Sequence, residues 1–264
     1  MRTWTVANQK GGVGKTTAVV TLAGWLREQG YRVLLVDLDP QASLTSYLSQ
    51  DEQAAKRSVY NLFDDRGAKA AELLLEGIGK YDLALLGATA AMATLDRQLG
   101  SQQGQGLVLH KALAPLAWRF DYVLLDCPPT LGVLMINALA AADRVVVPTQ
   151  TEHLALKGLE RMTRTLAMVN RSRPRYLEYL IVPTMFDRRT KASNHALEEL
   201  RRLYQWPVLW SDVVPVDTRF REASEQGKPL SQLAPDSRGA EAFRRLLEDL
   251  LAMDNDEFNG RGVA

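Results

Sequence analysis

Short runs of β-branched and apolar residues alternate along the chain with longer segments whose apolar positions have helical spacing. The strand-like runs cover residues 3–8, 32–37, 82–86, 121–126, 144–148, 177–183 and 208–210. The helix-like segments cover residues 16–29, 106–117, 131–141, 155–170, 192–204 and 238–253. Such alternation predicts parallel strands joined by right-handed crossovers. Because most strands are apolar on both faces, we expect helices above and below the sheet.

The pattern therefore predicts a three-layer α/β fold with a mostly parallel sheet. We expect one domain over residues 1–253, followed by a flexible tail over residues 254–264, because that tail is polar and contains glycine. In a fold of this class a ligand binds beyond the carboxyl ends of the strands, where the first loop leaves the sheet.

Composition narrows the class of protein. Of 264 residues, 46% are hydrophobic and 24% charged, which is typical of a folded domain and excludes a disordered chain. Cys127 is the single cysteine, so this chain alone forms neither a disulfide nor a thiolate-held iron–sulfur cluster. Neither a membrane-spanning stretch of about 20 apolar residues nor an apolar signal region is found, so we expect a cytoplasmic protein.

The net charge of +1 is unevenly distributed. Residues 157–202 contain eleven Lys and Arg residues against five acidic residues, a net charge of +6 for that segment. A basic surface of this kind indicates a polyanionic partner, although charged segments are more often simply solvated.

The clearest chemical signal follows the first predicted strand. Residues 9–17 read Gln-Lys-Gly-Gly-Val-Gly-Lys-Thr-Thr and lead directly into a helix. Glycines let successive backbone N–H groups face phosphate oxygens, and the helix adds its positive end. We expect Lys15 to reach the β- and γ-phosphates and Thr16 to ligate Mg²⁺. The expected nucleotide-binding residues here are Lys10, Gly11, Gly12, Val13, Gly14, Lys15, Thr16 and Thr17.

Two positions depart from the strict phosphate-loop pattern. Gln9 stands where that pattern has glycine, and Lys10 adds a second lysine at the mouth of the loop. Lys10 is either a solvated loop residue or one that points out of its own site toward a phosphate held by a second subunit.

Three aspartates end predicted strands beside this loop. Asp37 and Asp39 end the second, and Asp126 ends the strand over residues 121–126. An aspartate in this position usually anchors Mg²⁺, commonly through water. Each alone would more often be a turn or cap residue, but together they favour a metal site and a positioned water. Cys127 has no nearby His or Lys in sequence and is interpreted as a buried apolar residue.

These motifs resemble a known family. Lys10-Gly-Gly-Val-Gly-Lys-Thr-Thr, Val36-Asp-Leu-Asp-Pro-Gln and Leu125-Asp-Cys-Pro-Pro-Thr are similar to the ParA/MinD family of P-loop ATPases with a deviant Walker A motif. The resemblance extends from Arg2 to about Leu251 and is stronger to the ParA branch, which partitions plasmids, chromosomes and other large cargoes. Val216-Asp217 is similar to members that position chemosensory arrays or other polar machinery.

The resemblance implies an ATP-dependent sandwich homodimer with slow hydrolysis that an adaptor protein stimulates. Lys10 would reach the partner's nucleotide, Asp39 would position the attacking water, and Asp37 and Asp126 would lie around Mg²⁺. Lys10, Lys15 and Asp39 are thus the expected catalytic residues.

The base-binding and DNA-binding positions deviate from the family. Pro215 matches a base-contacting proline, whereas Asp217 stands where the family has asparagine. Val216 replaces an arginine that chromosome-partitioning members use to bind DNA. Neighbouring cations could supply that contact, and each is equally consistent with a solvated surface residue. These candidates are Arg188, Arg189, Lys191, Arg219 and Arg221.

Two alternatives remain. A MinD-like membrane-associated ATPase would end in a basic amphipathic helix, but this chain ends in an acidic, weakly apolar segment. A small-molecule ligase or kinase could use the same phosphate loop, although Lys10 favours the dimeric switch.

Overall fold

The computed structural model describes residues 1–49, 57–64, 68–78, 82–99 and 105–260. Seven strands in this part of the chain form one sheet in the order β3-β4-β2-β5-β1-β6-β7. The strands are β1 (Arg2–Val6), β2 (Val33–Asp37), β3 (Leu75–Ile78), β4 (Leu83–Leu86), β5 (Tyr122–Asp126), β6 (Arg144–Gln150) and β7 (Glu178–Thr184). All pairings are parallel except that of β3 with β4 at one edge.

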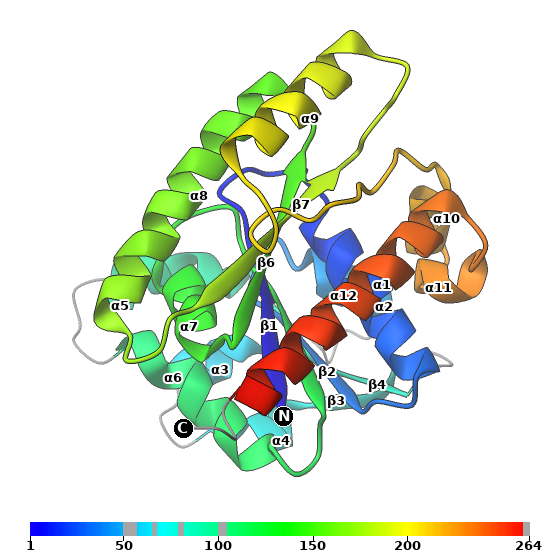
Figure 1. The fold of residues 1–264 in the computed structure, drawn as a ribbon. Helices are drawn as coiled ribbons and strands as arrows, with labels where there is room; N and C mark the ends of the chain where they lie inside the picture. The colour runs from blue at the N-terminus through cyan, green and yellow to red at the C-terminus, as the bar shows by residue number, and fades with distance from the viewer. Residues whose placement is uncertain (50–56, 65–67, 79–81, 100–104, 261–264) are drawn as a thin grey trace.

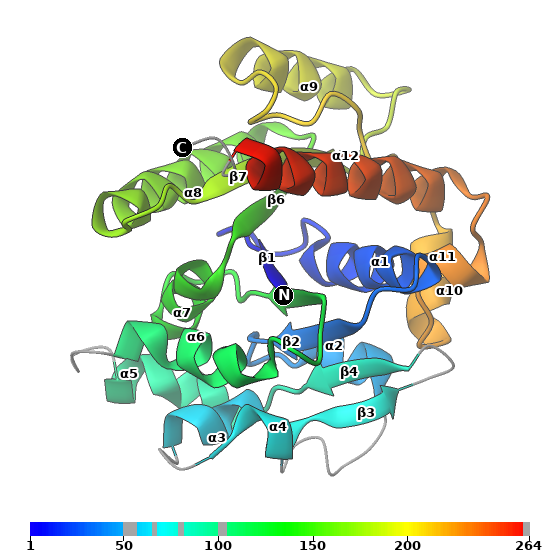
Figure 2. The same ribbon diagram turned by 60° about the horizontal axis from the view of Figure 1, so that its bottom comes forward.

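Helices cover both faces of the sheet, as Figures 1 and 2 show. The main ones are α1 (Lys15–Glu28), α6 (Val108–Leu113), α7 (Val133–Ala141), α8 (His153–Ser172), α9 (Lys191–Leu203), α10 (Arg219–Glu225) and α12 (Arg238–Gly260). The shorter ones are α2 (Ser43–Leu48), α3 (Val59–Asp64), α4 (Ala70–Leu73), α5 (Leu95–Leu99) and α11 (Leu230–Leu233), with 3-10 turns η3 (Ala90–Thr94), η4 (Gln105–Leu107) and η5 (Ala114–Leu116).

Each face of the sheet buries its own apolar core. On one face Trp4 packs with Leu22 of α1 and Phe243 of α12. On the other, Leu34 packs in a cluster with Leu139 of α7 and Met162 of α8. Alternate residues of the strands thus point to opposite helical layers. The predicted three-layer α/β fold is confirmed.

Two predicted elements differ from the structure, and one strand of the sheet was not predicted. Residues 208–210 make only an isolated bridge to β7 through Ile181 and Leu209, because Pro207 directly precedes them and cannot donate a ladder hydrogen bond. The helix predicted over residues 106–117 is divided into η4, α6 and η5, with Pro115 in the last turn. The prediction missed β3, whose Gly77 has a positive φ that interrupts the strand pattern.

The last helix is also longer than the helix predicted over residues 238–253. Helix α12 continues to Gly260, and Asp254 is buried, accepting a hydrogen bond from the Trp4 indole (3.1 Å). This polar contact anchors a segment whose composition alone predicted a loose tail. Residues 261–264 lie outside the described residues. Among the helices of the described ranges, none has both the length and the apolar character needed to cross a membrane.

Candidate nucleotide-binding site

The register of the sheet gathers the predicted carboxylates at one edge. Strand β5 lies between β1 and β2, so Asp126 is paired with Val6 on one side and Asp37 on the other. The loop after β1 and the segment after β2 therefore leave the sheet on either side of Asp126. The structure brings the phosphate loop, Asp37, Asp39 and Asp126 together, as parallel strand ends require.

The backbone of the phosphate loop needs glycine at two positions. Gly12 and Gly14 have φ values of 75° and 90°, a region in which residues with side chains are strained. Gly14 caps α1, and the amide of Ala18 donates to its carbonyl (2.9 Å). The loop thus presents the start of a 14-residue helix to the open edge of the sheet, an arrangement suited to phosphate.

The two lysines of the loop have different surroundings. Lys15 begins α1, is 92% buried and donates to the backbone carbonyl of Lys10 (3.3 Å). The Lys10 side chain instead forms an ion pair with Glu152 and a hydrogen bond to Gln150 (3.3 Å). Lys10 is therefore held by the end of β6 and the residue before α8, and is not a freely solvated loop residue.

Helix α8 approaches the loop closely because it carries glycine there. A Cβ atom placed at Gly158 would lie 3.2 Å from the Cβ of Lys10. Gln9, which stands at the position of the missing glycine, donates to the hydroxyl of Thr165 on the same helix (2.7 Å). The unusual entry to the loop is thus held against α8 at two positions about two turns apart.

Asp37 is fully buried, and both of its oxygens are engaged within the chain. Oδ2 accepts from the amide and the hydroxyl of Thr45 (both 2.8 Å), and Oδ1 accepts from the amide of Asp39 (3.1 Å). Burial raises the pKa of Asp37, while these hydrogen bonds oppose the increase. Asp37 therefore orders the segment that carries Asp39. Asp39 itself is half-buried, and its Oδ1 accepts from the amide of Gln41 (2.9 Å).

Asp126 is buried beside Thr16 and uses only one of its two carboxylate oxygens in hydrogen bonds among the described residues. The hydroxyl of Thr16 donates to its Oδ2 (2.6 Å), whereas Oδ1 is buried without a hydrogen-bond partner among the described residues. Burial, reinforced by Asp37, raises the pKa of Asp126. Mg²⁺ typically takes one or two protein oxygens and completes its shell with water and phosphate oxygens. The Thr16 hydroxyl and the Asp126 carboxylate fit such a site, and bound Mg²⁺ would supply charge stabilisation to the phosphates.

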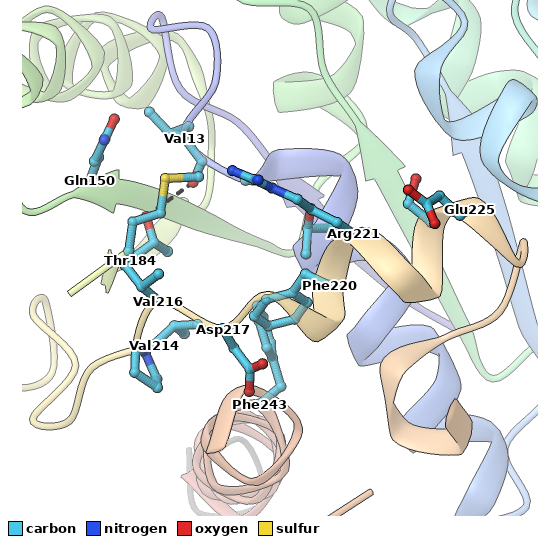
Figure 3. A pocket seen from close by; sticks show the side chains of 15 residues that line it. Val13, Gln150, Thr184, Val214, Val216, Asp217, Phe220, Arg221, Glu225 and Phe243 are labelled. Atoms are coloured by element: carbon cyan, nitrogen blue, oxygen red, sulfur yellow. Dashed lines mark hydrogen bonds between the residues drawn. The ribbon is translucent and has the colours of Figure 1, made fainter. Parts of the chain in front are cut away.

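A cavity of about 710 Å³ opens beside the loop (Figure 3). Val13, Gly14 and Thr17 line it from the loop, and its other walls come from the ends of β6 and β7, the segment before α10, α10 and α12. The residues that line those other walls are Gln150, Thr184, Met185, Val214, Pro215, Val216, Asp217, Phe220, Arg221, Ser224, Glu225 and Phe243. The cavity has the size and mixed apolar–polar lining of a small-molecule site.

Comparison with known proteins decides the family. Residues 1–179 match the family described as AAA domain. The chain is 41% identical over 253 residues to the chromosome-partitioning ATPase Soj of Thermus thermophilus, covering 94% of each protein. It is 37% identical over 261 residues to the chromosome partitioning protein ParA of Myxococcus xanthus, covering 98% of this chain and 91% of that one. The chain belongs to the ParA/Soj-type P-loop ATPases.

Solved structures share the fold of this chain. The cobyrinic acid a,c-diamide synthase of Mycobacterium smegmatis, crystallised with ADP and magnesium, is 37% identical and superposes with a TM-score of 0.80, covering 95% of this chain and 94% of that one. Apo McdA of Cyanothece, 24% identical, shares the fold with a TM-score of 0.84 over 95% and 99% of the two chains. This ParA/Soj-type protein is an ATPase that uses ATP with Mg²⁺, as its family and its phosphate loop require.

Both predicted base-contacting residues line the cavity, but Asp217 also has a structural role. Its Oδ1 accepts from the amide of Arg219 (3.0 Å), and its Oδ2 accepts from the amide of Gly239 (3.0 Å). The carboxylate thereby ties the start of α10 to the start of α12. An asparagine could accept only one of these two hydrogen bonds through its single amide oxygen.

The five candidate DNA-binding cations belong to two separate segments of the chain. Arg188 and Arg189 lie in the exposed segment just before α9 and Lys191 is its first residue, whereas Arg219 and Arg221 lie on α10. Arg189 forms an ion pair with Asp187 (2.8 Å), and the guanidinium lowers the pKa of that carboxyl to about 2. Arg221 lines the cavity beside the phosphate loop. The candidates therefore have different local environments.

Sequence reasoning missed the groups around Lys10 and most of the cavity wall. Glu152 and Gly158 are separated from Lys10 by more than 140 positions, so no local pattern connects them. The hydroxyl of Thr184, at the end of β7, donates to the carbonyl of Val13 (3.0 Å) and supports the loop. Alternation of strands and helices places Thr184 at the carboxyl edge, which was the available signal. Cys127 is buried, and burial raises the pKa of its thiol, as expected of a non-nucleophilic residue.

Proposed function

We propose that this protein is a nucleotide switch that closes as a homodimer around ATP and partitions or positions a large cargo. The observation that supports this proposal best is the second lysine of the loop, Lys10, which lies outside the cradle formed by Gly11 to Thr16. A lysine so placed adds nothing to binding within its own loop but is suited to a nucleotide held by a second copy. The relatives named as partitioning proteins agree with this role.

The site residues then have distinct roles. The loop amides and Lys15 bind the β- and γ-phosphates, and Thr16 with Asp126 holds Mg²⁺. Asp37 holds the segment that carries Asp39 in place through a hydrogen bond from the Asp39 amide, and Asp39 orients the attacking water. Lys10 of one subunit stabilises the charge that develops on the partner's phosphates, the role that an arginine finger has in other P-loop enzymes.

The contact of Lys10 with Glu152 bears on when hydrolysis occurs. To reach a partner's nucleotide, Lys10 must leave Glu152 and Gln150, which lie in its own subunit. A phosphate group with more than one negative charge competes well for the ammonium group, so dimer closure would move Lys10 from the carboxylate to the nucleotide. Slow turnover before closure follows from this arrangement.

A switch also needs a surface that distinguishes its two states. ATP-bound dimer and ADP-bound monomer must differ in affinity for that surface, because equal binding would shift no population. We propose non-specific DNA as the surface, bound by cations at the start of α9 and on α10 in place of the arginine lost at Val216. An adaptor protein would stimulate hydrolysis and release the dimer.

The direct test is retention on random duplex DNA with Mg²⁺ and either ATP or ADP, at two salt concentrations. The proposal predicts retention with ATP alone and weaker retention at the higher salt concentration. A matched pair of variants, Arg188→Ala and Arg171→Ala, separates the α9 start from general basic charge. If wild-type protein dimerises with ATP but does not bind DNA, DNA is not the surface, and a protein scaffold would take its place.

The likeness to cobyrinic acid a,c-diamide synthase supports a second candidate, a ligase acting on a small acid. Both functions use the same phosphate loop, but they differ in what drives turnover. Rapid hydrolysis that depends on a small carboxylic acid and an amide donor, without DNA or protein, would favour the ligase. For a membrane-associated ATPase of the MinD kind, α12 would have to release a segment whose first residue, Asp254, is buried in the fold.

A further inference from the structure

One cation of the cavity wall has no side-chain partner among the described residues, and its only assignment so far is as one of the candidate DNA-binding cations on α10. Arg221 is the third residue of α10 and one of the fifteen residues lining the 710 Å³ cavity. Its guanidinium makes no hydrogen bond or ion pair within the described part of the chain. Figure 3 shows the side chain extending from α10 across the cavity toward Val13 of the phosphate loop.

The charge of the cavity wall makes this position significant. The other charged lining residues are acidic, Asp217 and Glu225, and both oxygens of Asp217 already accept backbone hydrogen bonds. A nucleotide brings several negative charges into this space, and Arg221 is the one cation among the lining residues. An arginine fork pairs well with phosphate oxygens, and such charge-assisted hydrogen bonds are stronger than neutral ones.

The direction of the side chain indicates which part of the nucleotide it would meet. The apolar side chains Val214, Phe220 and Phe243 provide walls for a base at the α10–α12 end of the cavity. Val13, Gly14 and Thr17 mark the phosphate end, and the guanidinium points toward that end. Lys15 reaches the β- and γ-phosphates, so the α-phosphate is the one that receives no cation from the loop, and a cation arriving from α10 can supply it.

We propose that Arg221 binds the α-phosphate of the nucleotide, as a positioning residue that ties α10 to the occupied site. The inference rests on ATP binding by this family, not on dimerisation or DNA binding. ATP, ADP and AMP share the α-phosphate, so Arg221 strengthens the binding of all three nucleotides equally and does not distinguish ATP from ADP. Arg221 is then occupied whenever nucleotide is bound and is removed from the DNA-binding candidates.

The test is displacement of a fluorescent ADP analogue from wild-type protein, Arg221→Ala, Arg221→Lys and Arg219→Ala, in Mg²⁺. The competing ligands are ATP, ADP, AMP and adenosine. Arg219 lies on the same helix but does not line the cavity, so Arg219→Ala is the matched control for loss of one positive charge. Because Arg221 is exposed, its substitution leaves the core intact, and thermal unfolding verifies this for each variant.

We expect Arg221→Ala to bind ATP, ADP and AMP about tenfold more weakly, with unchanged affinity for adenosine. Arg221→Lys should recover part of the loss, and Arg219→Ala should bind like wild type. Unchanged nucleotide affinity in Arg221→Ala would overturn the proposal, as would an equal loss for adenosine or an equal loss in Arg219→Ala. Normal nucleotide binding combined with lost DNA retention would return Arg221 to the DNA-binding surface. Failure of the dimer or DNA proposal would leave these affinities unaffected.

Discussion

Buried charged groups at the amino ends of the strands (the amino edge) are fully paired, whereas those at the carboxyl ends (the carboxyl edge) are not. At the amino edge, Asp254 accepts from the Trp4 indole (3.1 Å) and from Arg144 (3.4 Å), and Arg144 also donates to Glu178 (2.8 Å). At the carboxyl edge, Oδ1 of Asp126 is buried without a partner among the described residues. The first arrangement is complete within the chain, whereas the second leaves a carboxylate oxygen that could accept a ligand.

This difference separates stability from function along the same strands. An unsatisfied buried polar group costs roughly 1–3 kcal/mol, so the carboxyl edge lowers the stability of the free protein. The raised pKa of Asp126, caused mainly by burial, reflects the same cost. A satisfied ionic network at the other edge anchors the last helix to β1 and β6. Substitutions at the amino edge should therefore lower thermal stability, whereas substitutions at the carboxyl edge should change nucleotide binding or hydrolysis.

The largest effect is expected from Lys15→Ala at the carboxyl edge. Loss of the ammonium group removes the charge that meets the phosphates, so ATP affinity should fall at least about a hundredfold with little change in thermal stability. Calorimetric titration with ATP and Mg²⁺ measures the first quantity, and chelation of Mg²⁺ should separately abolish hydrolysis. Wild-type ATP affinity in Lys15→Ala would rule out the phosphate-loop assignment.

Lys10→Ala should separate binding from turnover. The variant should bind ATP like wild type but lose adaptor- or DNA-stimulated hydrolysis, because no cation reaches the partner's phosphates. Glu152→Gln is the informative companion, since it frees Lys10 without removing it. Phosphate release measured at several protein concentrations should show faster basal hydrolysis for Glu152→Gln. Equal rates in wild type and Lys10→Ala would reduce Lys10 to a loop residue.

At the amino edge, Asp254→Ala should lower stability and leave ATP affinity unchanged. It removes the acceptor for Trp4 and one carboxylate partner of buried Arg144, at a cost of about 2–3 kcal/mol. The midpoint temperature of thermal unfolding should fall by roughly 5–10 °C for a chain of this size. Asp256→Ala, exposed on the same helix, is the control and should unfold like wild type. A stable Asp254→Ala variant would contradict the anchoring of α12.

The smallest effect is expected from Gly158→Ala on α8. The added methyl group lies 3.2 Å from the Cβ of Lys10, so the loop must move by a few tenths of an ångström. Hydrolysis should change by less than about tenfold, and alanine should not weaken the helix. In a double-mutant cycle with Lys10→Ala the effect of Gly158→Ala on hydrolysis should disappear. An equal effect in both backgrounds would mean that Gly158 acts independently of Lys10.

Sequence reasoning succeeded where chemistry and strand position are local. Gly12, Gly14 and Lys15 are adjacent in the chain, and parallel strand ends carry Asp37 and Asp126 to the same edge. It failed where the conformation of a segment depends on tertiary contacts with residues distant in sequence. Polar composition after residue 253 predicted a loose tail, yet hydrogen bonds from Trp4 and Arg144 hold Asp254 in place. The inward direction of Arg221 likewise depends on where α10 packs.

We expect ATP to close two copies of the chain around the carboxyl ends of the strands. Asp39→Ala tests it directly, because removal of the water-positioning carboxylate should preserve ATP binding and prevent hydrolysis from reopening the dimer. The measurement is light-scattering mass of Asp39→Ala in Mg²⁺ with ATP and with ADP. Closure by ATP predicts about twice the monomer mass with ATP and the monomer mass with ADP. A monomer in both nucleotides, with ATP bound, would contradict it.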